Sequence, residues 1–158
     1  MTSSTDQAKG AYTLRPGRND EADFIFDVTR ITMAEYAARS LKNWRRESMR
    51  EFADDTAAKG SFEIIEADGE RAGLLIVERH DSHIQLANLF IMPAFQNKGI
   101  GSHIIRMLID ESHAQTRPLK LRVFTSNPAR MLYQRLGFAV TDQTEERYFM
   151  EYRPRQAS

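Results

Sequence analysis

Hydrophobic residues are spaced differently in successive parts of the chain, and each spacing predicts one kind of element. A short strand is predicted at residues 12–14. Apolar residues then recur every three or four positions, which predicts a helix whose N-cap is Asn19 or Asp20. The predicted buried stripe of that helix consists of Phe24, Ile25, Val28, Ile31 and Tyr36.

A second, highly charged helix is predicted over about residues 43–53, with a narrow apolar seam of Trp44, Met49 and Phe52. The apolar period then changes to two, or to continuous apolar runs separated by turn residues. This pattern predicts a three-stranded meander at residues 62–66, 73–78 and 84–92.

Helical spacing returns after Pro93 and continues to about Gln115, carried by Ile100, Ile104, Ile105, Leu108 and Ile109. A strand at 119–125 follows, then a helix that Asn127-Pro128 starts and Gly137 ends. The predicted closing strands are 138–141 and 147–152. The predicted order is therefore β-α-α-β-β-β-α-β-α-β-β, a mixed α/β domain over residues 11–152 between polar tails at 1–10 and 153–158.

Composition excludes several classes of function. The chain of 158 residues fits one domain. Its 22 basic residues equal its 22 acidic residues, so it lacks the positive field that favours nucleic acids or membrane surfaces. The absence of cysteine excludes disulfides and a cysteine nucleophile. We expect a cytoplasmic protein with a small-molecule ligand, no nucleic-acid or membrane partner and, because the histidines show no ligand spacing, no metal.

A glycine-containing loop, Gln96-Asn97-Lys98-Gly99-Ile100-Gly101, leads from the last meander strand into the third helix. Free N–H groups at a helix start suit a phosphate or pyrophosphate. A Walker A loop would place its lysine after the glycines, whereas Lys98 precedes them. A dinucleotide loop would need a third glycine where Ile104 stands.

This loop and its flanks resemble the Gcn5-related N-acetyltransferase (GNAT) family. Gln96 to Gly101 match the family's Gln/Arg-x-x-Gly-x-Gly/Ala motif residue for residue. Leu89 to Pro93 match its preceding apolar strand with proline, and Asn127 to Phe138 match its later helix. The resemblance implies a mixed, mainly antiparallel sheet flanked by helices. It also implies direct transfer of an acetyl group from acetyl-CoA to a primary amine of a small molecule or peptide.

The resemblance also implies which residues bind the coenzyme. Phe90, Ile91 and Met92 would offer main-chain groups to the pantetheine arm. Asn127 and Arg130 would lie along the other side of the coenzyme. The pyrophosphate would be held by Gln96, Asn97, Lys98, Gly99, Ile100, Gly101 and Ser102.

Tyr133 falls on the family's tyrosine general acid, which would protonate the departing thiolate and also contact the coenzyme. The positions where relatives carry a base hold Gln85 and Ala87, which cannot take a proton. His83, on the same alternating face, is the candidate base and would act through water. The acceptor would bind along residues 36–50, where Tyr36 and Trp44 offer apolar surfaces and Arg39, Lys42, Arg45 and Arg46 offer charge.

Two other functions remain open on the sequence alone. The missing strand base is compatible with a CoA-binding sensor or interaction module that transfers no acetyl group. The glycine loop is compatible with an enzyme that binds ATP. The resemblance is also compatible with a homodimer formed through the last strands.

Overall fold

The computed structural model describes residues 11–40 and 46–154, the side chains of residues 35–40 excepted. Seven strands form one sheet in the order β1-β2-β3-β4-β5-β7-β6. They are β1 Thr13–Pro16, β2 Glu63–Ala67, β3 Glu70–Arg79, β4 Ile84–Ile91, β5 Leu119–Phe124, β6 Ala139–Gln143 and β7 Arg147–Tyr152. The pair β4 and β5 is parallel and the other neighbours are antiparallel, which confirms the predicted mixed, mainly antiparallel sheet.

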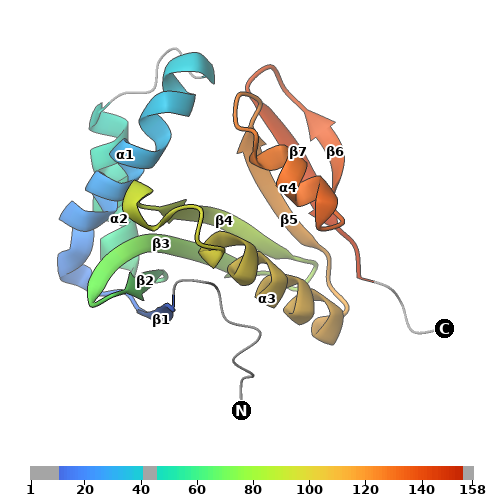
Figure 1. The fold of residues 1–158 in the computed structure, drawn as a ribbon, viewed down its shortest axis with the longest axis horizontal. Coiled ribbons are helices and arrows are strands. Elements are labelled where there is room, and N and C mark those ends of the chain that lie inside the picture. Colours follow the sequence, from blue (N-terminus) through green and yellow to red (C-terminus); the bar gives the residue numbers. More distant parts are fainter. Residues whose placement is uncertain (1–10, 41–45, 155–158) are drawn as a thin grey trace.

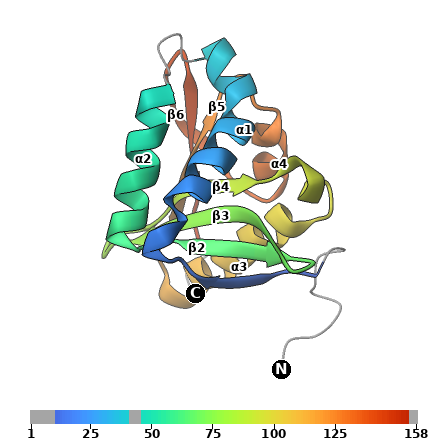
Figure 2. The same cartoon turned by 90° about the vertical axis from the view of Figure 1, so that its left-hand side faces the viewer.

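The predicted order of helices and strands is confirmed. Helices cover both faces of this sheet. They are α1 Ala22–Ser40, α2 Arg46–Lys59, α3 Ile100–Gln115 and α4 Ala129–Arg135, with short 3-10 turns η2 Asn19–Glu21 and η3 Pro93–Phe95. Helices α1 and α2 lie in front of the meander in Figure 2, and α3 lies behind it. Each face therefore has its own apolar core, one against α1 and α2 and one against α3.

Three details of the first helices differ from the prediction. Ile31 is 36% exposed, whereas Phe26 is 7% and Thr29 1% exposed, because α1 packs against the sheet and α2 at once and buries a wider side than one stripe. The N-cap also differs, since Arg18 precedes a 3-10 turn that contains both predicted caps. Helix α2 continues to Lys59 because Ala53 and Ala57 extend its buried side. The side chains of Tyr36 and Trp44 lie outside the described residues.

The parallel strands β4 and β5 are paired along only part of their length. Their register runs from Ile84 opposite Leu119 to Leu86 opposite Leu121. On the other side of β4, Val77 pairs with Leu86 and Ile76 with Asn88, so Ala87 is an extra residue. Such a bulge bends a strand and increases its local twist. Beyond the bulge β4 and β5 diverge, and Figure 1 shows the opening between the two halves of the sheet.

Gly73 allows the far end of β4 to approach β3 closely. It pairs with Ile91, and a Cβ atom at this position would lie 2.3 Å from the backbone oxygen of Phe90. We expect Gly73→Ala to lower the free energy of unfolding by about 2 kcal/mol, because backbone must shift to relieve the overlap. Urea denaturation measures this loss, and an unchanged midpoint would contradict the close approach.

Candidate active site

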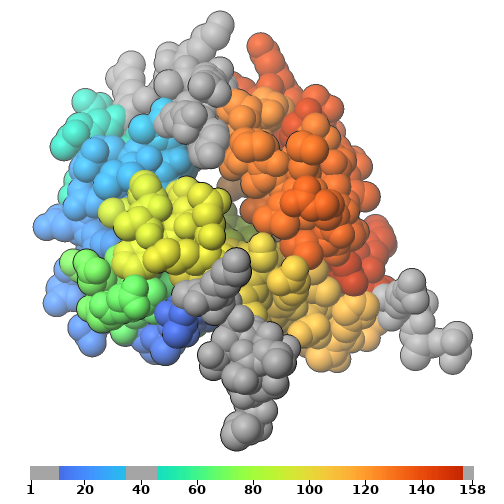
Figure 3. Space-filling view, viewed as in Figure 1, coloured from blue at the N-terminus to red at the C-terminus, as the bar shows by residue number. Residues whose placement is uncertain are grey.

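A cavity of about 630 Å³ occupies the opening between β4 and β5. Figure 3 shows it as a hollow between the N-terminal and C-terminal halves of the molecule. Its volume suits a small-molecule ligand. Its walls include Thr29, Thr32, Met33, Phe52, Leu86, Ala87, Asn88, Leu89, Phe90, Ile91, Phe95, Gln96, Asn97, Gly99, Ile100, Gly101, Ser102, Leu121, Arg122, Val123, Phe124, Asn127, Ala129, Leu132, Tyr133 and Arg147.

The glycine loop presents the start of α3 to this cavity. Gly99 has a φ of 82°, a left-handed conformation that favours glycine. The N–H of His103 donates to the carbonyl of Gly99 at 3.0 Å, so the N–H groups of the three preceding residues have no helical carbonyl four residues behind them. Those residues, Ile100, Gly101 and Ser102, line the cavity. Together they form a partly positive cradle that fits a phosphate or pyrophosphate.

Two side chains of the predicted loop contact neighbouring protein groups. The Gln96 amide donates to the backbone oxygen of Ile91 at 2.8 Å and ties the loop to the end of β4. The Lys98 ammonium lies 5.7 Å from the ring centroid of Phe95, and Lys98 does not line the cavity. The cradle therefore consists mainly of backbone groups.

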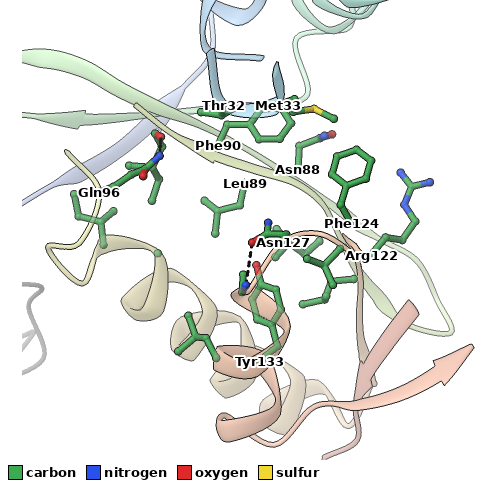
Figure 4. Close-up of a pocket in the computed structure, with 18 of the residues that line it drawn as sticks. Thr32, Met33, Asn88, Leu89, Phe90, Gln96, Arg122, Phe124, Asn127 and Tyr133 are labelled. Carbon is green, nitrogen blue, oxygen red and sulfur yellow. Dashed lines mark hydrogen bonds between the residues drawn. The ribbon is translucent and has the colours of Figure 1, made fainter. Parts of the chain in front are cut away.

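Tyr133 projects from α4 into the centre of the cavity (Figure 4). Its ring packs at a tilt against Phe138, with centroids 5.8 Å apart, and its backbone oxygen accepts the N–H of Phe138 at 3.0 Å. Among the described residues the Tyr133 hydroxyl has no hydrogen-bond partner. Burial raises the pKa of Tyr133 to about 12, so the phenol stays protonated at neutral pH.

The remaining predicted coenzyme residues divide between the cavity wall and its surroundings. Phe90, Ile91 and Asn127 line the cavity. The Asn127 side chain accepts the N–H of Ala129 at 2.9 Å and fixes the start of α4, as Figure 4 shows. Met92 and Arg130 are not in the wall: the Met92 N–H donates to Ala72, and the Arg130 guanidinium stacks on a tyrosine ring.

His83 lies outside the cavity. It precedes β4 at the end where β4 and β5 are still paired, whereas the cavity begins at Leu86. Its ring stacks on His80, with centroids 4.8 Å apart, and burial and the charge of Lys120 lower its pKa. Within the described part of the chain, no histidine, aspartate or glutamate lines the cavity.

The wall opposite the glycine loop contains residues that the sequence did not single out. Thr32 and Met33 come from α1, and Phe124 and Arg122 from β5. Arg147, the first residue of β7, joins them because it pairs with Phe124 in the β5–β7 register. Of the predicted acceptor wall, the side chains of Tyr36, Arg39, Lys42, Trp44 and Arg45 lie outside the described residues, and Arg46 stacks on Phe26.

A family profile described as an acetyltransferase (GNAT) domain matches residues 30–154, most of the chain. The chain belongs to the GNAT acetyltransferase family. It is therefore an acetyl-CoA-dependent N-acetyltransferase. This membership removes the ATP-binding alternative, and it agrees with a glycine loop that lacks both a third glycine and a following lysine.

Solved structures share the fold of this GNAT acetyltransferase at low sequence identity. The PaiA N-acetyltransferase from Thermoplasma acidophilum, in complex with coenzyme A, has a TM-score of 0.69 at 16% identity, covering 90% of this chain and 99% of its own. An acetyltransferase from Thermus thermophilus has a TM-score of 0.71 at 16% identity, covering 93% and 99%. The ribosomal-protein-S18-alanine N-acetyltransferase from Escherichia coli has a TM-score of 0.66 at 20% identity, covering 93% and 96%.

Two further findings concern the described residues as a whole. No group of three or more histidine, aspartate and glutamate side chains in that part of the chain is arranged to hold a metal ion. No helix there combines the length and the apolar character needed to cross a bilayer.

Proposed function

We propose that this N-acetyltransferase transfers the acetyl group directly to a primary amine of a small molecule or peptide, with Tyr133 as general acid. The observation that carries the proposal is the Tyr133 hydroxyl, which points into the cavity without a hydrogen-bond partner among the described residues. Its raised pKa keeps it protonated at neutral pH. A positioned acid of this kind contributes typically about 10²–10⁴-fold to a rate.

The cavity fits the coenzyme on two counts. The N–H groups at the start of α3 suit its pyrophosphate. The part of β4 beyond Leu86 no longer pairs with β5, so Phe90 and Ile91 can offer main-chain groups to an extended arm. Asn127, just before α4, would border the coenzyme, and Met92, Lys98 and Arg130 remain predicted contacts just outside the wall. Acetyl-CoA, when bound, supplies the activated acetyl thioester.

Tyr133 would hold its proton until sulfur leaves as the thiolate. Its neutral form is favoured because the cavity wall buries the phenol, and burial disfavours the charged phenolate. The packing against Phe138 and the backbone bond at the end of α4 fix the direction of the ring. The proton therefore stands at a defined atom on one side of the cavity.

The proton of the attacking amine has no carboxylate or imidazole acceptor among the described lining residues. We infer that the amine binds in its neutral form, or loses its proton to water. His83 remains a predicted base acting through water, without support from its position. A cytoplasmic location and a homodimer also remain predictions.

The pH profile of kcat/KM should follow from this arrangement. We expect activity to rise with pH through the pKa of the acceptor amine itself, because only the neutral amine attacks. We expect no alkaline decline from Tyr133 below about pH 11, because its pKa is raised to about 12. Initial rates measured with amines of graded pKa check this. A rise at one fixed pH near 6 to 7 for every amine would instead indicate a protein base.

Release of free CoA thiol from acetyl-CoA in the presence of an amine panel tests the proposed function. Thiol release that depends on the amine, with the acetylated amine found by mass spectrometry, is the expected result. Tight binding of acetyl-CoA without turnover on any amine would instead favour the CoA-binding sensor.

A further inference from the structure

Two arginines line the cavity on the side away from the glycine loop, and the fold fixes the backbone of one of them. The Arg147 N–H donates to the Thr144 hydroxyl at 3.1 Å, and the Arg147 oxygen accepts the Thr144 N–H at 2.8 Å. The Arg147 guanidinium carbon lies 4.8 Å from the centroid of the Phe124 ring. These contacts hold the charged group against the cavity wall.

Arg122 lies on the same face of the sheet as Arg147. In the β5–β7 register Phe124 pairs with Arg147 and Arg122 pairs with Phe149, so the two arginines are diagonal neighbours. Burial lowers the pKa of Arg147, and the positive charge of Arg122 lowers it further. The two guanidinium groups therefore repel each other across this wall.

Neither arginine has an anionic partner among the described residues. Lys120, two residues before Arg122 on β5, differs, because its ammonium reaches the carboxylate of Glu151 at 4.0 Å. The charge of Glu146, next to Arg147, only partly offsets the lowering of the Arg147 pKa. Two adjacent cations that form no ion pair with a described carboxylate suit an oxyanion, which guanidinium groups bind through paired hydrogen bonds.

The position of the pair separates it from the coenzyme cradle. In Figure 4 Gln96 and Arg122 lie on opposite sides of the cavity, with Tyr133 between them. Phe124 lies against Arg147, and Met33 and Phe90 add further apolar surface to the cavity wall. An acceptor in this position would reach the centre of the cavity with its amine and the arginines with another group.

We propose that Arg122 and Arg147 bind an oxyanion on the acceptor, so that the enzyme acetylates amines that also carry a carboxylate or a phosphate. This inference rests on the proposed acetyl transfer. It assigns the class of acceptor by its charge. The acceptor pairs described next distinguish a carboxylate from a phosphate. The arginines act as specificity-determining residues and take no part in proton transfer.

Acceptor pairs that differ only in the anion test the proposal. Phenylalanine with phenylalanine amide examines a carboxylate, and phosphoethanolamine with ethanolamine examines a phosphate. Each rate is compared at equal concentration of the neutral amine, because the members of a pair differ in amine pKa. We expect kcat/KM to favour the anionic member of at least one pair by about 10-fold or more. Arg122→Gln and Arg147→Gln should each remove this preference by raising the acceptor KM, with the KM for acetyl-CoA unchanged.

Arg135→Gln is the matched control, because Arg135 is an exposed arginine on α4 that does not line the cavity. It should leave the preference intact. Arg122→Lys should keep part of the preference that Arg122→Gln removes. If Arg147→Gln does not fold, the test rests on the two acceptor pairs, measured with the wild-type enzyme and with Arg122→Gln. Equal rates for both members of each pair overturn this inference but leave the acetyl transfer standing. Absence of transfer to any amine overturns both.

Discussion

Tyr133→Phe should lower kcat for acetyl transfer by about 100-fold or more, because it deletes the proton donor and keeps the ring. Stability should change little. The Phe138 contact uses the ring, and the hydroxyl has no partner among the described residues to lose. Steady-state kinetics and a thermal melting curve measured on the same preparation separate the two effects.

Tyr148→Phe is the matched control for that substitution. Tyr148 is also half-buried, but it lies under the Arg130 guanidinium and does not line the cavity. It should retain the wild-type kcat. Binding of CoA to Tyr133→Phe, measured by calorimetry, should stay within a few-fold of wild type. Turnover of Tyr133→Phe at the wild-type rate would show that Tyr133 is only a packing residue.

The sequence predicts best those elements in which apolar residues recur at a regular spacing. The stripe of α3 is confirmed, since Ile100, Ile104 and Ile105 are at most 1% exposed. Such a stripe reflects one partner surface, so local spacing suffices to find it. Helix α1 has two partner surfaces, and its apolar spacing predicts a buried Ile31, whereas that side chain is 36% exposed. The position of a helix between its neighbours is a tertiary property that its own sequence does not contain.

The same distinction applies to the site. The glycine loop and Tyr133 each belong to a contiguous segment, and both line the cavity. Strand alternation predicts the face on which the His83 side chain lies but not the point where two strands separate. That point follows from the bulge at Ala87. Arg122 and Arg147 meet through the β5–β7 register, so their pairing could be found only from the folded chain.

Gly101→Asp should raise the KM for acetyl-CoA by about 100-fold or more without unfolding the protein. A Cβ atom at Gly101 would meet only the Ile91 side chain, at an ordinary 3.4 Å, so there is room for the substitution. An acidic residue in the first turn favours a helix by about 0.3–1 kcal/mol through the macrodipole. The fold should therefore tolerate the change or gain from it.

The cost falls on the coenzyme instead, because the new carboxylate stands beside the N–H groups that would hold the pyrophosphate. Two like charges about 4 Å apart near a protein surface repel by about 4 kcal/mol. Gly101→Asn, nearly the same shape without the charge, should raise the KM far less. Added salt should narrow the gap between the two variants because ions screen the repulsion. Equal losses in Asp and Asn variants would instead mean that side-chain bulk, and not charge at the start of α3, controls coenzyme binding.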